Sequence, residues 1–273
     1  MIREGNEINI YSIDNKLNKK KLIVIVMFIL ILLLLILIAI NSTNIIRSNK
    51  VYLQYEKQLA TLNYQKEQEE AKKEAERLAK IPKLTEEGKK NVKEIYHSDT
   101  KRAFLTFDDG PSSVTNTILD VLKQEEVKAT FFVLGNRVEK MPDVVRRIYD
   151  EGHYIANHGY SHMYENIYAS PQAVLEEFNK CNDAVKSAIN VPEYNSHLFR
   201  FPGGFTGGKY ADIKNQANEL LKQNNIVYVD WNALNGDAET NNLSIDFELC
   251  RLKETVQNKN SIVILMHDAP AKK

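Results

Sequence analysis

The sequence has little cysteine and no excess of charge, and each absence excludes a class of protein. Two cysteines, Cys181 and Cys250, in 273 residues are too few for a disulfide framework or for a zinc site built from cysteine. They are either buried apolar side chains or partners in a single bridge, and their spacing does not decide between the two. Basic and acidic side chains number 36 each, whereas a nucleic-acid-binding domain usually carries a basic excess. We therefore expect no nucleic-acid partner.

The zero net charge is a sum over two unlike parts. Residues 1–99 hold 17 basic and 13 acidic side chains, whereas residues 100–273 hold 19 basic and 23 acidic ones. A basic N-terminal part thus precedes a mildly acidic C-terminal part.

An unbroken apolar run covers residues 22–40. Its 19 residues, at ~1.5 Å rise per residue, span a hydrocarbon core of ~30 Å. A cleaved signal peptide would have an apolar region of only ~7–15 residues and a small-residue cleavage site, so the run predicts an uncleaved transmembrane anchor. Four lysines precede the run, but only Arg47 and Lys50 follow it closely. The positive-inside rule then predicts a single-pass protein of the cell membrane, with a cytoplasmic tip at residues 1–21 and an extracellular C-terminal part.

A charged helical stalk and linker are predicted for residues 41–99. No glycine or proline occurs from residue 51 to 80, and several Glu–Lys pairs four residues apart favour a helix that Pro82 ends. An apolar coiled-coil spacing starts at Tyr55 but is not maintained. A single solvated helix is therefore favoured over weak self-association through the stalk, and a disordered charged linker is the other alternative.

From residue 100 onward, short apolar runs alternate with amphipathic stretches. The runs predict buried strands at Ala103–Phe107, Thr130–Val133, Tyr154–Ala156, Leu198–Phe201, Ile226–Val229 and Ile262–Met266. The amphipathic stretches predict helices at Val114–Gln124, Met141–Glu151, Pro171–Ile189 and Tyr210–Asn224. This alternation predicts a parallel sheet with right-handed crossovers, as an open α/β sheet or a (β/α) barrel. In both folds, functional side chains gather at the carboxyl ends of the strands.

Four of these strands run directly into polar or glycine-rich clusters. The side chains concerned are Asp108, Asp109, His158, His162, Arg200 and His267. The two histidines at 158 and 162 would lie on one side of a helical turn, which is an arrangement that binds divalent metals, although the H-E-x-x-H protease pattern is absent. Each cluster alone also occurs on ordinary surfaces. Together, two histidines and one aspartate can bind a metal with an open position for water, which leaves an aspartate and a histidine as base and acid for hydrolysis of an amide or ester.

With these motifs the sequence resembles the NodB-like polysaccharide deacetylases, carbohydrate esterase family 4, over roughly residues 100–273. The most specific motif is T-F-D-D-G-P at residues 106–111. The resemblance implies a distorted (β/α) barrel and one divalent metal ion, expected to be zinc. It implies that Asp109, His158 and His162 are the metal ligands.

The resemblance also implies roles for the remaining motif residues. Asp108 would be the general base, Arg200 the residue that orients it, and His267 the general acid. Gly203 would offer its backbone N–H to the oxyanion, and Leu265 would form a wall of the acetyl pocket.

The chain departs from the family pattern at several positions. Gly159 stands where Ser or Thr is usual and Gly203 where an aromatic residue is usual, which predicts a more open groove. Of the W-x-x-D-x-x-D-W motif only Trp231 and Asp237 match. Trp231 is then a candidate substrate-binding residue, and Asp237 is the candidate to tune the catalytic histidine, with nearby Asp230 as the alternative.

The sequence ends six residues after His267, where the family continues through a further helix and strand. We therefore expect residues 100–273 to lack the last barrel unit and to leave a strand edge exposed.

Two functions from different classes follow. The first is a membrane-anchored enzyme that removes N-acetyl groups from a cell-wall polysaccharide, with N-acetylglucosamine of peptidoglycan as the expected substrate and chitin oligomers or another acetylated wall polymer as alternatives. The second is a catalytically impaired wall-binding or scaffold protein. The complete set of site residues counts against the second function, and the early end of the sequence counts for it.

Overall fold

The computed structural model describes residues 10–239 and 244–269, and the chain divides into two compact units, Met1–Ala75 and Glu76–Lys273. Residues 1–9 of the predicted cytoplasmic tip and the last four residues of the chain lie outside the described residues. The sequence-based boundaries at residues 21, 40 and 99 stay predictions.

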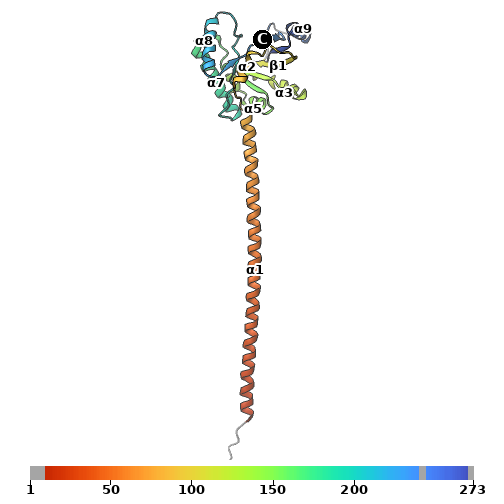
Figure 1. Cartoon of the computed structure of the whole chain (residues 1–273), viewed down its shortest axis with the longest axis vertical. Coiled ribbons are helices and arrows are strands. Elements are labelled where there is room, and N and C mark those ends of the chain that lie inside the picture. Colours follow the sequence, from red (N-terminus) through yellow and green to blue (C-terminus); the bar gives the residue numbers. More distant parts are fainter. Residues whose placement is uncertain (1–9, 240–243, 270–273) are drawn as a thin grey trace, which may run out of the picture. The chain divides into compact units, whose positions relative to one another are not determined.

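A single helix, α1, runs from Ile10 to Ala79 (Figure 1). It contains the apolar run at residues 22–40, whose side chains are exposed on all sides, as in a helix that contacts lipid. By length and composition, it is the one helix of the described residues that could cross a membrane. In its charged part, Lys73 Nζ lies 2.7 Å from Glu69 Oε1. No glycine or proline interrupts the helix, and Pro82 follows shortly after its end.

Seven parallel strands form one sheet in the described part of the second unit. They are β1 (Arg102–Asp108), β2 (Thr130–Val133), β3 (Tyr154–Asn157), β4 (Leu198–Phe199), β5 (Val227–Tyr228), β6 (Ala233–Leu234) and β7 (Ser261–His267). Their order is β5-β4-β3-β2-β1-β7-β6, so the sheet curls into a half-barrel in which β7 lies beside β1. This confirms the predicted α/β class with a parallel, incompletely closed barrel. The last strand is paired on both sides, and the edges of the sheet are β5 and β6.

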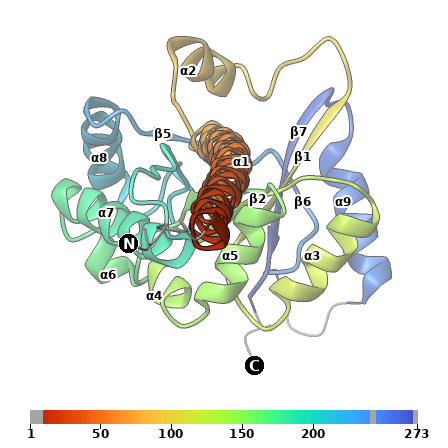
Figure 2. The same ribbon diagram turned by 90° about the horizontal axis from the view of Figure 1, so that it is seen from below.

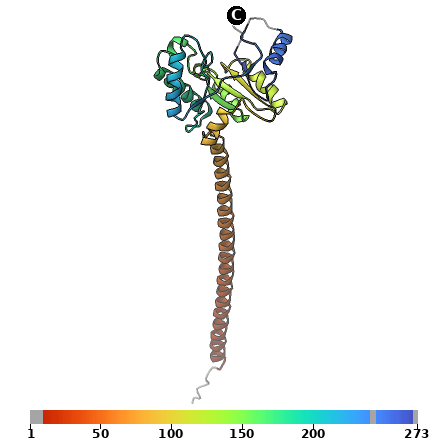
Figure 3. The same ribbon diagram turned by 45° about the horizontal axis from the view of Figure 1, so that its top comes forward.

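Most of the helices lie outside the curled strands, as Figures 2 and 3 show from two directions. The helices are α2 (Glu86–Lys93), α3 (Thr115–Gln124), α4 (Gly135–Val138), α5 (Pro142–Asp150), α6 (Tyr164–Ile167), α7 (Pro171–Ile189), α8 (Ala211–Gln223) and α9 (Ile245–Val256). The long helix α7 packs against α4, α5 and α8. The four helices predicted after residue 100 correspond to α3, α5, α7 and α8, whereas α2, α4, α6 and α9 were not predicted.

Aromatic side chains fill the space between the sheet and the helices. Phe131 on β2 is fully buried, and its ring stacks on Phe107 of β1 at 5.2 Å between centroids. A second cluster surrounds Phe199 and Phe201, whose rings meet edge to face at 4.9 Å. Burial of this apolar area stabilises the packing of the strands against the helices. The polar residues lie beyond this core, at the carboxyl ends of the strands.

The prediction of four-residue strands at 198–201 and 226–229 is wrong in length, because only two residues of each join the sheet. After β4 the chain turns, and the carbonyl of Phe201 accepts a hydrogen bond from the N–H of Gly204 at 2.8 Å. The strand β6 was not predicted, since two residues are too few to show an alternating pattern.

The linker before β1 is attached to the amino ends of the strands, opposite the predicted site. Arg102 donates through Nη2 to the carbonyl oxygens of Glu94 at 3.2 Å and His97 at 2.9 Å. Ser261, the first residue of β7, donates to the carbonyl of Ile95. Burial and the charge of Asp230 raise the pKa of the neighbouring Tyr96 to about 12. The linker therefore packs as part of the second unit.

The two cysteines do not form a bridge. Cys181 is fully buried on α7, whereas Cys250 is exposed on α9, and both thiols are free. The buried apolar interpretation therefore holds for Cys181 alone, and burial raises the pKa of its thiol.

Candidate metal and catalytic site

Four strands of the half-barrel end at one rim, and the predicted site residues follow them. Asp108 is the last residue of β1 and lies opposite His267, the last residue of β7, in the parallel register. His158 follows β3 directly, and Arg200 follows β4 directly. The carboxyl ends of parallel strands therefore bring together side chains that are far apart in the sequence.

Asp109, His158 and His162 form a cluster that could hold a metal ion, with one ligand atom of each within 4.8 Å of the others. Asp109 Oδ1 lies 3.6 Å from His158 Nε2 and 3.3 Å from His162 Nε2. Two ligands at ~2.1 Å from a tetrahedral zinc ion are ~3.4 Å apart, so the spacing fits a divalent metal. Two imidazoles and one carboxylate are also the protein ligands of some catalytic zinc sites.

The individual donor atoms have lone pairs that are available to a cation. Asp109 Oδ1 is buried and has no hydrogen-bond partner within the described part of the chain. His158 Nδ1 lies 2.8 Å from the carbonyl oxygen of Arg200, so a proton on Nδ1 leaves the Nε2 lone pair available to a metal. Burial raises the pKa of Asp109, but three nearby histidines and Arg137 lower it more, and the carboxylate form is therefore favoured.

The two metal-site histidines lie on a loop, and the predicted helical turn at residues 158–162 is wrong. The loop follows β3 and bends through positive φ values of 87° at Gly159 and 57° at His162. A side chain at Gly159 would also approach Ile167 Cδ1 to 2.9 Å. Glycine is therefore favoured at this position, and the loop brings the two imidazoles together without helical geometry.

Two buried polar side chains hold this loop. Glu177 on α7 accepts hydrogen bonds through Oε2 from the backbone N–H groups of Tyr160 and Ser161, each at 2.7 Å. Asn157, the last residue of β3, accepts from the N–H of Gly159 at 2.9 Å. These hydrogen bonds satisfy backbone N–H groups of the loop, which have no partner in a helix or a strand.

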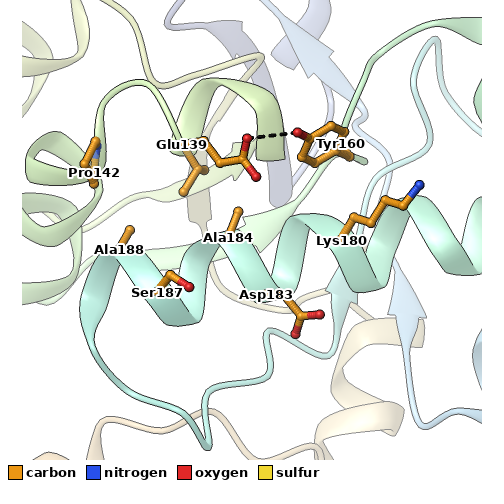
Figure 4. Close-up of a pocket in the computed structure, with 9 residues that line it drawn as sticks. Glu139, Pro142, Tyr160, Lys180, Asp183, Ala184, Ser187 and Ala188 are labelled. Carbon is orange, nitrogen blue, oxygen red and sulfur yellow. Dashed lines mark hydrogen bonds between the residues drawn. The ribbon is translucent and has the colours of Figure 1, made fainter.

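The side chain of Tyr160 lines a groove beside α7 and is bound to Glu139. Its hydroxyl donates to Glu139 Oε2 at 2.9 Å, and both residues line this groove of about 640 Å³ (Figure 4). Tyr160 therefore contributes its backbone, and not its ring, to the arrangement of the metal donors.

Asp268 supports the Asp-Asp turn from inside the protein. It is fully buried, its N–H donates to the carbonyl of Asp108 at 3.1 Å, and its Oδ2 accepts from Thr115 Oγ1 at 2.7 Å. A Cβ at Gly110 would lie only 2.0 Å from that Oδ2, so glycine alone lets the turn approach the carboxyl group. Burial raises the pKa of Asp268 to about 7.

Arg200 is fully buried and forms an ion pair with Asp108. Its Nη1 donates to Asp108 Oδ1 at 2.7 Å and to Thr106 Oγ1 at 2.8 Å. Its Nε donates to the carbonyl of Val229, and its Nη2 donates to the carbonyl of Asp230, both at 3.0 Å. Every guanidinium nitrogen thus has an acceptor, as a buried cation requires. Asp108 Oδ2 stays on the side of the metal donors, 3.8 Å from His158 Nε2.

His267 is held by Asp237 through two contacts. Asp237 Oδ1 lies 2.7 Å from His267 Nδ1, and Asp237 Oδ2 accepts from the backbone N–H of His267 at 2.6 Å. Burial lowers the pKa of His267, but the hydrogen bond and charge of Asp237 raise it more, so its pKa is above the ordinary value. Asp230, the alternative from the sequence, instead accepts from the N–H of Phe205 at 2.9 Å.

The three predicted substrate-binding residues lie around the same rim. Leu265 on β7 is nearly buried, and Trp231 packs against Gly204, where an added Cβ would lie 3.1 Å from the indole. Gly203 has a φ of 75°, and its N–H makes no hydrogen bond to any residue that the structure describes. The expected open space beside Gly203 is filled by Tyr164, so the prediction of a more open groove there is wrong.

The sequence-based prediction did not include the side chains that position the site residues through hydrogen bonds. Arg137 donates through Nη1 to the carbonyl of Asp109 at 2.6 Å, and Thr106 and Glu177 make the contacts described above. Glu177 lies in the apolar stripe of a long amphipathic helix, next to Phe178. A carboxylate inside such a stripe was a usable signal, because buried charges are almost always paired. Arg137 offers no comparable signal.

Known proteins share both the sequence and the fold. The family model for polysaccharide deacetylases matches residues 96–225. A peptidoglycan-N-acetylglucosamine deacetylase of Bacillus cereus is 32% identical over 173 residues, which cover 62% of this chain and 60% of that protein. The chain spans about half to three fifths of the length of the curated relatives that it matches first.

Two solved structures extend the comparison. A carbohydrate esterase of family 4 from Streptococcus mutans superposes with a TM-score of 0.59 and 31% identity, covering 66% of this chain and 78% of that one. The catalytic domain of a peptidoglycan N-acetylglucosamine deacetylase from Eubacterium rectale gives a TM-score of 0.57 and 32% identity, covering 63% and 80%.

Replacement of His162 by alanine removes one of three donors. We expect the affinity for Zn²⁺ to fall by roughly 100-fold or more, since even the loss of a residue that only supports a ligand costs ~10–100-fold. Isothermal titration of the full chain with Zn²⁺ measures this change. His97→Ala removes an exposed histidine of the linker and serves as the control. Equal Zn²⁺ affinity of the two variants would exclude this cluster as the metal site.

Proposed function

Because the chain belongs to the polysaccharide deacetylase family, carbohydrate esterase family 4, we propose that it hydrolyses N-acetyl groups of an extracellular glycan and releases acetate. The observation that carries this proposal is the placement of Asp108 and His267 on paired strand ends beside a cluster of three metal donors. Such an arrangement provides a base, an acid and a cation site around one reacting carbonyl.

Zinc is the metal that we propose, because two imidazoles and one carboxylate suit it better than they suit Mg²⁺ or Ca²⁺. A divalent cation bound by Asp109, His158 and His162 supplies a Lewis acid that polarises a carbonyl oxygen and lowers the pKa of water to about 7.

Asp108 is the proposed general base. Arg200 and Thr106 surround it inside the barrel, and the Arg200 contact at 2.7 Å fixes Oδ1. The free lone pairs of Oδ2, on the side of the metal donors, then accept the proton of the attacking water. Attack on the acetamide carbon forms a tetrahedral oxyanion. The N–H of Gly203 donates to this oxyanion, a contact worth about 3 kcal/mol in comparable oxyanion holes.

His267 is the proposed general acid. Its Nδ1 is held by Asp237, so its Nε2 is the nitrogen that delivers a proton to the departing amine. The raised pKa of His267 favours retention of this proton to higher pH than in an ordinary imidazole. Cleavage of the C–N bond then yields acetate and a free amino sugar.

The proposed substrate is N-acetylglucosamine of peptidoglycan. The names of the relatives from Bacillus cereus and Eubacterium rectale specify this substrate for those proteins. The apolar part of α1 supports a membrane anchor, and the lysines that precede it support a cytoplasmic N-terminus by the positive-inside rule. The catalytic unit would then lie outside the cell membrane, on the same side as the wall.

Acetate release from peptidoglycan tests both the deacetylase activity and the side of the membrane on which the catalytic unit lies. Intact protoplasts that carry the full chain, given Zn²⁺ and soluble peptidoglycan fragments too large to enter, are expected to release acetate. Asp108→Asn is expected to lower the rate at least about 100-fold, because general bases typically contribute ~10²–10⁴-fold. Asp212→Asn, which changes an exposed aspartate on α8, is the matched control.

The outcomes of this experiment separate the alternatives. No acetate from protoplasts or from lysed cells would contradict the enzymatic function and favour the scaffold function. Release only after lysis would contradict the topology and leave the chemistry intact.

The pH profile tests the assignment of His267. The acid must be protonated to act, so activity is lost as pH rises through its pKa, and a raised pKa extends activity to higher pH. Asp237→Asn removes the charge that raises this pKa, and the alkaline limb of kcat/KM is expected to move to lower pH. Glu239→Gln changes a nearby exposed carboxylate and serves as the control. An alkaline limb that stays in place in Asp237→Asn would contradict the role of His267.

A further inference from the structure

Tyr164 lies between the metal-donor cluster and the turn that carries Gly203. Its ring centroid is 5.7 Å from that of His162. A Cβ added to Gly203 would lie 2.4 Å from Tyr164 Oη and 3.1 Å from Tyr164 Cζ, so the phenol end of the ring is in contact with Gly203 itself. A side chain that touches both a metal donor and the proposed oxyanion donor borders the space in which the acetamide reacts.

The contact between Tyr164 and Gly203 depends on glycine at position 203. A side chain at position 203 would collide with the phenol, and the φ of 75° at this position already favours glycine. The absence of a side chain at Gly203 therefore leaves room for an aromatic ring that comes from a different segment, the short helix α6. The two residues are 39 positions apart, and only the fold brings them together.

Other aromatic side chains support the ring. Tyr168 meets it edge to face at 5.7 Å between centroids, and Tyr210 lies at 6.4 Å. The hydroxyl of Tyr168 donates to the carbonyl of Pro202 at 2.7 Å, which ties the same aromatic group to the turn before Gly203. This packing fixes the ring at low entropic cost when a ligand binds.

Part of the Tyr164 side chain nevertheless stays available. The residue is 41% exposed, and its hydroxyl makes no hydrogen bond to any residue that the structure describes. A supported, partly exposed aromatic ring is typical of a binding site, where the ring contacts apolar surface of the ligand.

We propose that Tyr164 binds the sugar that carries the reacting acetamide, with its ring against the C–H face of the pyranose. This inference rests on the proposed deacetylase function. The ring acts on the sugar, and the chemistry at the carbonyl is left to Asp108 and His267.

Steady-state kinetics with two substrates test the proposal. With the Zn²⁺-loaded full chain, Tyr164→Ala is expected to raise KM for an N-acetylglucosamine oligosaccharide roughly 10-fold, the upper part of the range for one aromatic contact, and to change kcat less than about 2-fold. Hydrolysis of a small acetyl ester, which has no sugar ring, is expected to stay at the parental rate. Tyr164→Phe keeps the ring and is expected to stay within about 3-fold of the parent for both substrates.

A neighbouring variant controls for general disturbance of the segment. Met163→Ala removes a 55% exposed side chain next to Tyr164, and both substrates are expected to keep their parental constants. If Tyr164→Ala leaves KM for the oligosaccharide unchanged, the inference is wrong. Equal losses with both substrates, or a loss of Zn²⁺ affinity, would mean that Tyr164 only supports the metal loop, which also overturns it. If the parent chain releases no acetate from any N-acetylated sugar, the proposed function itself fails.

Discussion

The buried ion pair between Arg200 and Asp108 is the interaction on which the site depends. Removal of one partner of such a pair typically costs ~3–5 kcal/mol, because the other charge stays buried without compensation. In this chain the guanidinium also donates to Thr106 on β1 and to the backbone that connects β5 with β6. One cation thus fixes the positions of several strand ends and leaves the second carboxylate oxygen of Asp108 facing the metal donors.

The metal donors are likewise positioned by hydrogen bonds from residues that are not themselves donors. These donors lie on loops, and loop residues keep a fixed position only when their backbone groups are bound. Glu177 binds two N–H groups of the histidine loop, Arg137 binds the carbonyl of Asp109, and Asp268 lies beneath the Asp-Asp turn. The donors can therefore be close together before a cation binds, and the half-barrel supplies the rigidity.

The sequence allowed prediction of the residues at the strand ends but not of the way the loops present them. Alternating apolar runs located β1, β2, β3 and β7, because buried parallel strands have a strong local pattern. The helical turn at residues 158–162 was wrong, since the loop depends on Glu177. The place of Glu177 in an apolar stripe indicates that it is buried and paired, but not which backbone groups it binds. The open groove at Gly203 was wrong for a similar reason, because Tyr164 reaches that position only in the folded chain.

The most direct test of this account is the rate of acetate release by Arg200→Lys, measured with Zn²⁺ content determined on the same sample. Lysine keeps the charge but has a single nitrogen, so it cannot serve the four acceptors that Arg200 binds. We expect the rate to fall about 100-fold, as when a general base is misplaced, at unchanged Zn²⁺ stoichiometry. A rate equal to that of the parent chain would contradict the central role of the Arg200–Asp108 pair.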